Sequence, residues 1–368
     1  MTRYRAGIVG LGRMGWLYDA AVYDRAQARP PAVRDPTGAL TTLPPLMAGS
    51  PSPAAHPGRE GLPQSYAEAF WLHPQTELVA GCDTAPDRRA AFGAHYGIAA
   101  LYHDYRDCLR AEGLDIVAIT STADLRPDAT QFAVECGARA IITEKPMAAS
   151  LAGADVMVEV CARAGVPLAC GNISVSHPAF GNARAQLEHG AIGSVLSLDT
   201  GTALAQHNPW IYLVDSPAVW VVGTGDAAPA TAPEREFRGA GLIRFQSGVT
   251  GSVRPGAPLL RLTGERGELT FDGHAFRLWQ DVVTVAGPTR VEVPFPTPNL
   301  AGEWSALYTV DDAVACLERG GEPRVSGRRV RDAMEIELAL RESQRRGHVR
   351  VDLPLADRSL RLHYDWFR

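Results

Sequence analysis

The chain has 368 residues, of which 46% are hydrophobic and 21% are charged, and its formal net charge is −5 at pH 7. This composition is typical of a globular protein with about two domains. The negative balance provides no basic field for a polyanion, which argues against nucleic acid as a partner. The sequence contains no run of 18 uninterrupted apolar residues and no secretory leader pattern, so we expect no membrane association and a cytoplasmic protein.

Cysteine and lysine are both distributed in an informative way. The six cysteines are scattered, with no Cys-x-x-Cys pair and no histidine cluster at metal-ligand spacing. This indicates buried thiols in a reduced compartment and no metal centre. Arginine replaces lysine almost everywhere, and Lys145 is the only lysine in the sequence. Its position is therefore a candidate for a specific chemical role.

The first predicted element is a short buried strand that ends in a glycine-rich turn. Residues 6–9 are mostly apolar, and Gly10, Gly12 and Gly15 follow at the spacing Gly-x-Gly-x-x-Gly. In a dinucleotide-binding fold the first glycine allows a tight turn, the second lets the backbone approach a pyrophosphate, and the third lets the next helix pack closely. Apolar pairs four residues apart between 16 and 21 predict that this helix follows, with its N-terminus facing the anion. The triplet alone is also compatible with an ordinary turn.

Residues 24–63 differ in composition from the rest of the chain. Nine prolines lie there among small and polar residues, and neither helix nor strand periodicity survives. We interpret the stretch as an insertion. It is either a solvated excursion from the surface or, because long loops in compact domains are often functional, a lid or an oligomer contact.

Strands and helices then alternate through residue 143, and a further helix leads to one more strand that ends at residue 172. This alternation predicts a doubly wound parallel sheet with helices on both faces, and we place the dinucleotide-binding domain at 1–145, the insertion included. Helices are expected at 65–70, 85–96, 105–112, 127–136 and 150–164, and strands at 76–83, 114–120, 139–143 and 166–172.

The strand at 76–83 ends in an acid, Asp83. In a dinucleotide fold such a carboxylate accepts hydrogen bonds from the ribose hydroxyls of the adenosine, about 20 residues after the glycines. When the insertion at 24–63 is left out of the count, the number of residues between the glycine loop and Asp83 is near that value. The carboxylate would repel a 2′-phosphate, which favours NAD over NADP, and Arg88 and Arg89 weaken this preference without reversing it. Asp83 is alternatively a helix N-cap for residues 85–96.

Beyond residue 190 the pattern changes to short alternating segments separated by glycine-containing turns. It predicts a large, open, mainly antiparallel sheet in an α+β domain, which we place at 146–368. An uncovered sheet face would favour aggregation, so we expect it to be buried in a homodimer or homotetramer. Strands are expected at 194–199, 240–245, 249–253, 259–262, 268–271, 276–279 and 290–293, and helices at 300–319 and 326–345.

Taken together, the glycine loop, Asp83 and the run Thr-Glu-Lys-Pro at 143–146 resemble the glycine fingerprint and the Glu-Lys-Pro motif of the Gfo/Idh/MocA family of NAD(P)-dependent dehydrogenases. The stretch 177–195 is similar to the family's helix that leads into an open sheet. The resemblance covers almost the whole chain except the insertion and the C-terminal tail. It implies a Rossmann domain, an open-sheet domain, NAD as cofactor and a small-molecule substrate.

The resemblance also implies the site, with Lys145 beside the nicotinamide and in contact with the reacting hydroxyl. A partly desolvated lysine beside a positively charged ring has a lowered pKa and can take part in proton transfer, and Pro146 biases Lys145 away from helix. Asn172 and His177 lie where the family contacts substrate, and an N-cap or a solvated loop residue is the alternative. The candidate cofactor-binding residues are Gly10, Gly12, Arg13, Met14, Gly15, Asp83, Arg88, Ser121, Glu144 and Lys145.

The family usually carries an Asp-x-x-x-His pair at the start of a helix in the second domain. Here His207 resembles the histidine, an imidazole suited to general acid–base catalysis, while Ala203 stands where the family has aspartate. Either His207 acts without an orienting carboxylate, or Lys145 carries the proton transfer, or the chemistry differs; His207 is alternatively a structural residue. Trp210 is a candidate stacking surface for a substrate ring or, alternatively, a core residue.

These features predict an NAD-dependent oxidoreductase that transfers hydride between nicotinamide and a secondary alcohol or ketone of a sugar, cyclitol or related molecule. Lys145 would exchange the proton, assisted by His207. The broken Asp-x-x-x-His pair leaves alternatives open. One is reduction of an imine or other non-sugar group, or a lyase or hydrolase reaction in which NAD is recycled. Another is a non-catalytic NAD-binding sensor.

Overall fold

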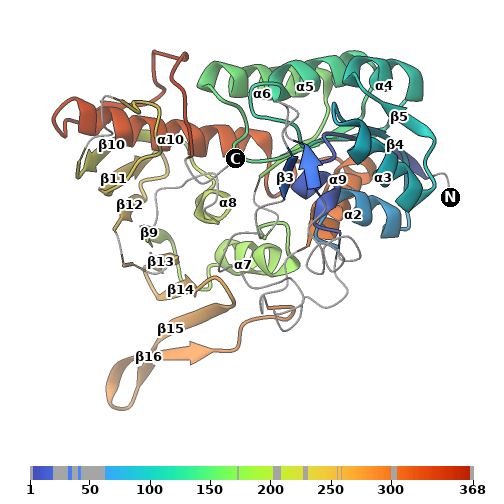
Figure 1. Ribbon diagram of the computed structural model, residues 1–368. Helices are drawn as coiled ribbons and strands as arrows, with labels where there is room; N and C mark the ends of the chain where they lie inside the picture. The colour runs from blue at the N-terminus through green and yellow to red at the C-terminus, as the bar shows by residue number, and fades with distance from the viewer. Residues whose placement is uncertain are drawn as a thin grey trace. The chain divides into compact units, whose positions relative to one another are not determined.

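Figure 1 shows the computed structural model of the chain. It describes residues 3–19, 63–171, 174–201, 209–226, 231–254, 256–257, 259–299 and 305–364, and the backbone of 32–34 and 40–42. Contacts within the chain divide it into two compact units. The first comprises residues 1–148, 156–173 and 303–326, and the second comprises 149–155, 174–302 and 327–368.

The first unit is built on a six-stranded parallel sheet. All four residues of each of the strands 116–119 and 140–143 are buried, as expected for a parallel sheet that is covered on both faces. The sheet order is β5-β4-β1-β6-β7-β8, so the direction of strand progression reverses between β1 and β6. The strands are β1 (Tyr4–Val9), β4 (Thr76–Cys82), β5 (Ala100–Tyr102), β6 (Ile116–Ile119), β7 (Ala140–Thr143) and β8 (Leu168–Cys170).

Helices cover both faces of this sheet, as in a doubly wound fold. Side chains of three helices, α2, α3 and α9, form one core with alternate residues of the strands, among them Ile8, Ile116 and Ile142. Helices α4 and α5 pack on the other face. The predicted doubly wound parallel sheet is thus confirmed. The helices are α2 (Tyr66–Leu72), α3 (Pro86–Tyr96), α4 (Tyr105–Glu112), α5 (Arg126–Glu135), α6 (Leu151–Ala164), which begins in the second unit and ends in the first, and α9 (Ala306–Arg319).

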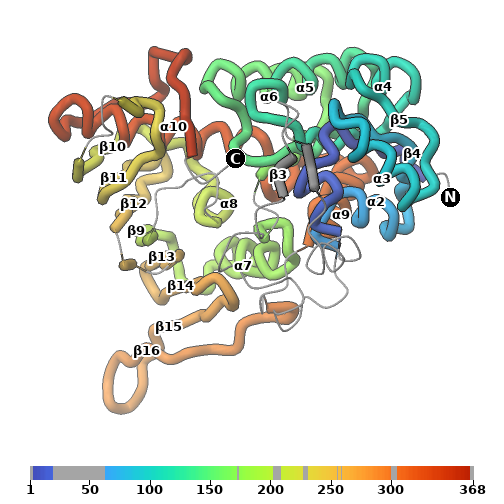
Figure 2. Tube along the Cα trace, viewed as in Figure 1, coloured from blue at the N-terminus to red at the C-terminus, as the bar shows by residue number. Residues whose placement is uncertain are grey.

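Helix α9 comes from the C-terminal part of the chain but belongs to the first unit. Figure 2 shows this orange segment beside the blue helix α2. Val310 and Val314 lie in the same core as Phe70, and the main-chain nitrogen of Ala306 donates to the carbonyl of Pro63 at 3.0 Å. The boundary predicted at residue 145 assigns this helix to the second domain, and the core packing corrects that assignment.

The element after the glycine loop differs from the prediction. Instead of a helix that continues to residue 21, the chain forms a five-residue π-helical turn, Arg13–Leu17. The buried Asp19 follows it, and its carboxylate accepts a hydrogen bond from the hydroxyl of Tyr96 and lies 3.2 Å from His95 Nε2. These contacts with α3 fix the chain where an α-helix would have continued.

Two further differences concern short strands. Within the predicted insertion, where neither helix nor strand is expected, β2 (Ala32–Arg34) and β3 (Leu40–Thr42) pair in antiparallel fashion; the rest of the insertion lies outside the described residues. Strand β5 is a further strand that the sequence pattern does not predict. Each of these strands has three residues, too few to display a periodicity of two.

The second unit contains a nine-stranded sheet in the order β16-β15-β14-β13-β9-β12-β11-β10-β17. All pairs are antiparallel except β9 and β12, which confirms the predicted mainly antiparallel sheet. Strands β10 and β17 are additions to the predicted set. The strands are β9 (Val195–Thr200), β10 (Ala218–Thr224), β11 (Ala240–Phe245), β12 (Thr250–Val253), β13 (Leu260–Gly264), β14 (Gly267–Phe271), β15 (Phe276–Thr284), β16 (Gly287–Val293) and β17 (Val351–Asp352).

The long helix α10 (Gly327–Arg345) packs on the sheet at β10. Glycine permits the close approach, because a Cβ at Gly223 would lie 2.3 Å from the carbonyl oxygen of Leu340. The unit also contains α7 (Pro178–Glu188) and the short α8 (Trp210–Val214).

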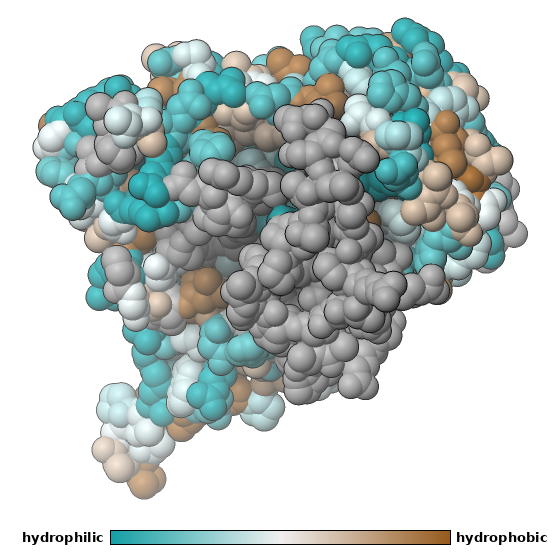
Figure 3. Space-filling view, viewed as in Figure 1, coloured by the Kyte–Doolittle hydropathy of each residue, from teal (hydrophilic) through white to brown (hydrophobic). Residues whose placement is uncertain are grey.

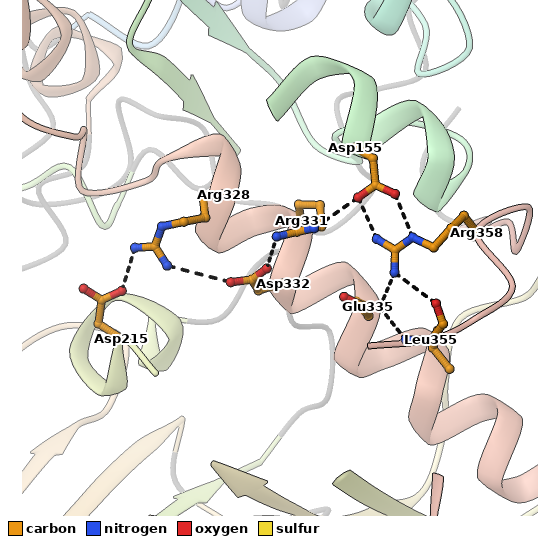
Figure 4. A network of polar contacts seen from close by, with 8 residues as sticks. All are labelled: Asp155, Asp215, Arg328, Arg331, Asp332, Glu335, Leu355 and Arg358. Carbon is orange, nitrogen blue, oxygen red and sulfur yellow. Dashed lines mark hydrogen bonds and ion pairs between the residues drawn. The ribbon is translucent and has the colours of Figure 1, made fainter. Parts of the chain in front are cut away.

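A polar network ties α10 to other segments of the second unit (Figure 4). Arg358 donates two hydrogen bonds to Asp155 and also binds Glu335, while Arg331 reaches Asp155 at 3.1 Å. Arg328 links α10 to the end of α8 through Asp215 at 2.9 Å. Burial opposes ionisation of Asp215, but its bonds with Arg329 and Arg328 hold the pKa of this carboxyl well below its usual range.

The surface of the second unit includes exposed apolar side chains. At the end of the hairpin formed by β15 and β16, Val283 and Val285 are 88% and 112% exposed, and Figure 3 shows hydrophobic colour at this tip. Leu196 and Leu242 are 52% and 46% exposed on β9 and β11. The homo-oligomer expected through an open sheet face stays a prediction.

Candidate functional site

Four neighbouring parallel strands bring the predicted residues to one edge of the first unit. Asp83 follows β4, Gly10 follows β1, Ser121 follows β6 and Lys145 follows β7. The carboxyl ends of parallel strands meet at the same edge, and ligands of such sheets bind there beside the point where strand order reverses. Three strand spacings of about 4.8 Å separate the first strand from the last by about 14 Å, so a ligand that reaches both ends must be extended.

The glycine loop is held between its neighbouring strands. Gly10 has φ +100°, and a Cβ at this position would lie 2.7 Å from the nitrogen of Ser121, so only glycine fits without strain. Its nitrogen donates to the carbonyl of Cys82 at 2.7 Å, and its carbonyl accepts from the hydroxyl of Thr120. A Cβ at Gly15 would lie 2.1 Å from the Gly10 carbonyl oxygen. The turn is therefore fixed by contacts on both sides.

Asp83 connects this loop to β4 and α3. Oδ2 accepts from the nitrogen of Leu11 at 2.8 Å and from Arg88 at 2.9 Å, and Oδ1 accepts from the nitrogen of Ala85 at 2.9 Å. Its bond with Ala85 lies at the start of α3, whose N-cap residue is Ala85 itself. The carboxylate thus both supports the loop and carries the cation of Arg88 beside it.

Two observations indicate that this edge accommodates the phosphate and ribose groups of a dinucleotide. A Cβ at Gly12 would meet no atom of the described residues within 4 Å, so the loop is open at the position where a pyrophosphate is expected. Ser121 Oγ is buried and has no hydrogen-bond partner in the described part of the chain. An unpaired buried hydroxyl costs about 1–3 kcal/mol, and a ligand oxygen would satisfy it. Arg13 and Met14 are only partly buried beside Gly12.

The Glu-Lys-Pro turn after β7 is packed around a buried carboxyl group. Glu144 is 3% exposed; its Oε1 accepts from the hydroxyl of Tyr66 at 2.9 Å and its Oε2 accepts from the nitrogen of Lys145 at 3.3 Å. Burial raises the pKa of Glu144, although Lys145, Arg126 and the Tyr66 bond oppose the shift. Burial and the Glu144 carboxyl raise the pKa of Tyr66 well above its usual value, so its hydroxyl stays a hydrogen-bond donor.

Lys145 lies in an environment that favours its neutral amine. Burial lowers its pKa, the Glu144 carboxyl opposes this, and the positive charges of Arg126 and Arg13 lower it further. The direction and its largest cause, burial, agree with the prediction, and the positive charges that lower the pKa further belong to the chain itself. A lysine whose pKa is lowered toward neutrality is suited to accept and return a proton.

The remaining predicted residues have mixed outcomes. His177 is 1% exposed and is the N-cap of α7, with Nδ1 accepting from the nitrogen of Ala179 at 3.0 Å. Trp210 is fully buried, and its ring packs edge-on against Phe245 at 5.8 Å. The structure therefore corrects the prediction of Trp210 as a substrate contact, because a fully buried ring has no surface to offer a substrate. Asn172, Ala203 and His207 lie outside the described residues.

Three residues at the site were not among the sequence predictions: Tyr66, Thr120 and Arg126. Each contacts the site from an element far from its partners in the sequence, so no local pattern reveals the contact. Arg126 does carry one signal. It starts helix α5, where the helix dipole disfavours a positive charge, and such a placement indicates a role other than helix stabilisation.

Comparison with known proteins agrees with this geometry. Residues 59–172 match the model of the GFO_IDH_MocA oxidoreductase family, described as an NAD-binding Rossmann fold. These residues belong to the Gfo/Idh/MocA oxidoreductase family. The matched range contains β4 to β8, and the glycine loop before it joins the same sheet through β1. For these residues the family and the NAD-binding Rossmann fold predicted from the sequence are confirmed.

Individual similar proteins extend over more of the chain. D-Apiose dehydrogenase of Paraburkholderia graminis is 29% identical over 291 residues, which cover 68% of this chain and 76% of that protein. An oxidoreductase domain protein from Kribbella flavida is 16% identical with a TM-score of 0.66 over 96% of this chain and 100% of that one. The WlbA dehydrogenase from Bordetella pertussis, solved with NADH and UDP-GlcNAcA, is 19% identical with a TM-score of 0.58 over 96% and 99% of the two chains. At these identities the solved structures show the fold alone.

Two searches of the described residues came out negative. None of the helices there is both long enough and apolar enough to cross a bilayer. In that same part of the chain, His, Cys, Asp and Glu side chains do not gather in groups of three or more that could hold a metal ion.

Proposed function

We propose that the whole chain is a Gfo/Idh/MocA oxidoreductase that uses NAD to oxidise a secondary alcohol of a sugar or cyclitol, or to reduce the corresponding carbonyl. The observation that carries the proposal is the place of Lys145. The one lysine of the chain follows β7, two strands from the glycine loop, and burial lowers its pKa. A D-apiose dehydrogenase that is 29% identical supports a sugar as the substrate class.

The residues at the sheet edge have distinct roles in this proposal. Main-chain groups around Gly12 and the hydroxyl of Ser121 bind the pyrophosphate and ribose oxygens, and Asp83 binds the adenosine ribose. The bound NAD would supply the hydride acceptor for oxidation of the alcohol, and NADH the hydride donor for the reverse reaction. Lys145 takes the hydroxyl proton in oxidation and returns it in reduction, with His207 assisting.

The proposed preference for NAD over NADP rests on Asp83. Its carboxylate lies at the end of β4, where the ribose of the adenosine is expected, and it would repel a 2′-phosphate. Arg88 donates a 2.9 Å hydrogen bond to Oδ2 of Asp83, and its positive charge reduces the repulsion of the 2′-phosphate. We therefore expect NAD to be preferred by a modest factor, with NADP still used.

Steady-state assays with a panel of aldoses and cyclitols, each with NAD and NADP, test the proposal. Turnover of at least one polyol with NAD is expected, and Lys145→Ala should lower kcat by about 10²- to 10⁴-fold, as loss of a positioned acid–base group does. Arg139→Gln is a matched control, because Arg139 is exposed and pairs with Asp115 away from this edge. Near-normal kcat in Lys145→Ala would exclude the proposed role of Lys145.

The pH profile provides an independent check. If Lys145 must be neutral to accept the proton, kcat/KM for alcohol oxidation rises with pH through a midpoint below the usual lysine value of about 10.4. Because Lys145→Ala removes the titrating group, the residual kcat/KM of this variant should not show this rise with pH.

The sequence favours one further possible reaction, because Ala203 stands where the family has an aspartate. Tightly bound NAD with substrate conversion but no net NADH would assign a lyase or hydrolase reaction that recycles the cofactor.

A further inference from the structure

Arg126 binds the carbonyls of the two residues that flank Lys145. It is the first residue of α5 and is 1% exposed. Its Nη1 donates to the carbonyl of Glu144 at 2.7 Å and to the carbonyl of Pro146. These carbonyls belong to the residues immediately before and after Lys145. One guanidinium nitrogen thus fixes the turn that carries the lysine.

The burial of Arg126 is difficult to explain by structure alone. Burying a charge is unfavourable unless its hydrogen bonds are satisfied, and the Nε of Arg126 is buried without a partner in the described part of the chain. An uncharged donor such as an amide could bind the same carbonyls. What a guanidinium adds, and a neutral donor does not, is a permanent positive charge.

That charge acts on Lys145 together with charges of neighbouring residues. From the described residues, the charges that act on Lys145 are the Glu144 carboxyl, which favours its ammonium form, and Arg126 and Arg13, which disfavour it. Tyr66 and Cys170 face Arg126 and Glu144, and both keep their protons because burial raises their pKa values. Arg126 is therefore a fully buried cation that opposes the effect of Glu144 on Lys145.

We propose that Arg126 is a positioning residue that acts through Lys145: it fixes the carbonyls of the residues before and after the lysine and places a second buried positive charge within electrostatic range of its amine. The proposal deepens the function proposed above and rests on it for the catalytic consequence. The effect of Arg126 on the lysine can be tested independently of the proposed function, because it can be measured without any substrate.

The composition of the chain makes this measurement direct. Because Lys145 is the only lysine, protein grown with [ε-13C]lysine gives one lysine resonance, and its chemical shift follows the protonation of the Lys145 amine. A pH titration of the wild type and of Arg126→Gln compares the two midpoints. Loss of the buried cation is expected to raise the midpoint by about one pH unit, or tenfold in the proton affinity of the amine. Arg139→Gln, which removes an exposed arginine from the same unit, should leave the midpoint in place.

Kinetics separate the charge from the hydrogen bonds. In Arg126→Gln the acidic limb of the kcat/KM profile should move to higher pH with the NMR midpoint. Arg126→Lys keeps the charge and should keep the wild-type limb, while kcat falls because an ammonium group replaces the planar guanidinium that holds both carbonyls. Because Arg126→Lys contains a second lysine and would give a second NMR resonance, this variant is followed by kinetics. Thermal unfolding of each variant checks that it is folded.

Each outcome has a definite meaning. An unchanged NMR midpoint in folded Arg126→Gln overturns the proposal even if the wild type is an active dehydrogenase. A raised midpoint in a protein that turns over no polyol supports the role of Arg126 and instead refutes the function proposed above. If Arg126→Gln does not fold, Arg126→Lys decides, and wild-type kcat at every pH in that variant overturns the positioning role.

Discussion

The main-chain nitrogen of Leu11 donates a 2.8 Å hydrogen bond to Oδ2 of Asp83. The glycine loop after β1 and the acid after β4 are therefore joined directly. Arg88 binds the same carboxylate oxygen at 2.9 Å. Replacing Asp83 would consequently disturb the loop as well as any ribose contact, which makes Arg88 the better position at which to test cofactor choice.

Arg88→Ala should increase the preference for NAD over NADP. Removal of the cation leaves the Asp83 carboxylate uncompensated, so its repulsion of a 2′-phosphate grows. We expect the ratio of kcat/KM for NAD to that for NADP to rise about tenfold, equivalent to ~1.4 kcal/mol. The two cofactors are compared with one substrate, and Arg110→Ala, at an exposed position on α4, is the control. An unchanged ratio contradicts this account of Arg88.

Two alanine substitutions in the glycine loop should have different effects. Gly12 has φ −78°, and a Cβ added to it would meet no described atom within 4 Å, so Gly12→Ala should change the free energy of unfolding by less than about 0.5 kcal/mol. Its methyl group would occupy the space expected for pyrophosphate, and NADH affinity should fall at least about tenfold. Fluorescence titration with NADH and thermal unfolding measure the two quantities.

Gly10→Ala is the counterpart. With φ +100° and a Cβ position 2.7 Å from the Ser121 nitrogen, the substitution should destabilise the fold by about 1–3 kcal/mol. The same thermal unfolding experiment measures this loss. Equal stabilities of Gly10→Ala and Gly12→Ala would mean that the loop does not have the described conformation.

Tyr66→Phe should move the titration of Lys145 in the direction opposite to Arg126→Gln. The hydroxyl bond to Glu144 lowers the pKa of that carboxyl, so its loss makes Glu144 easier to protonate. A protonated Glu144 no longer favours the ammonium form of Lys145, and the 13C midpoint of the lysine should fall. Removing one partner of this buried bond should also cost about 1–3 kcal/mol of stability. A midpoint that rises would show that Glu144 does not couple Tyr66 to Lys145.

Trp210→Ala tests the core assignment of this tryptophan. Loss of a fully buried ring that packs on Phe245 should destabilise the protein by about 3–5 kcal/mol. Trp71, which is 55% exposed, provides the matched control, and Trp71→Ala should cost much less. Denaturant unfolding compares the two. A stable Trp210→Ala variant with a raised KM for substrate would restore the interpretation of Trp210 as a substrate contact.

Helices and strands whose hydrophobic pattern has a strong period could be predicted from the sequence. The helix at 105–112 and the strand at 240–245 have the same bounds in the structure, because amphipathic spacing and alternation are visible locally. Strand β10 has consecutive apolar residues instead of alternation, and the three-residue strands are too short for any period. Tertiary contacts to Tyr96 and His95, rather than local propensity, determine the conformation at Asp19.

The candidate site was predictable where its residues follow strands directly. Gly10, Asp83 and Lys145 are at strand ends, and strand ends can be predicted from hydrophobic patterns. Their partners could not be predicted in the same way. Tyr66 belongs to a helix that contacts Glu144 across a distance of 78 residues, and Arg126 reaches the lysine turn from the start of another helix.

The path of α9 affects how the protein can be made. The nucleotide-binding core includes Ala306, Val310, Ala313 and Val314, so this core is incomplete until the ribosome has translated most of the chain. Domains usually fold as they are synthesised, N-terminal domain first, but here the first 148 residues emerge without the helix that covers α2. We expect a fragment ending at residue 148 to expose apolar surface and aggregate, and nascent chains of intermediate length to depend on chaperones.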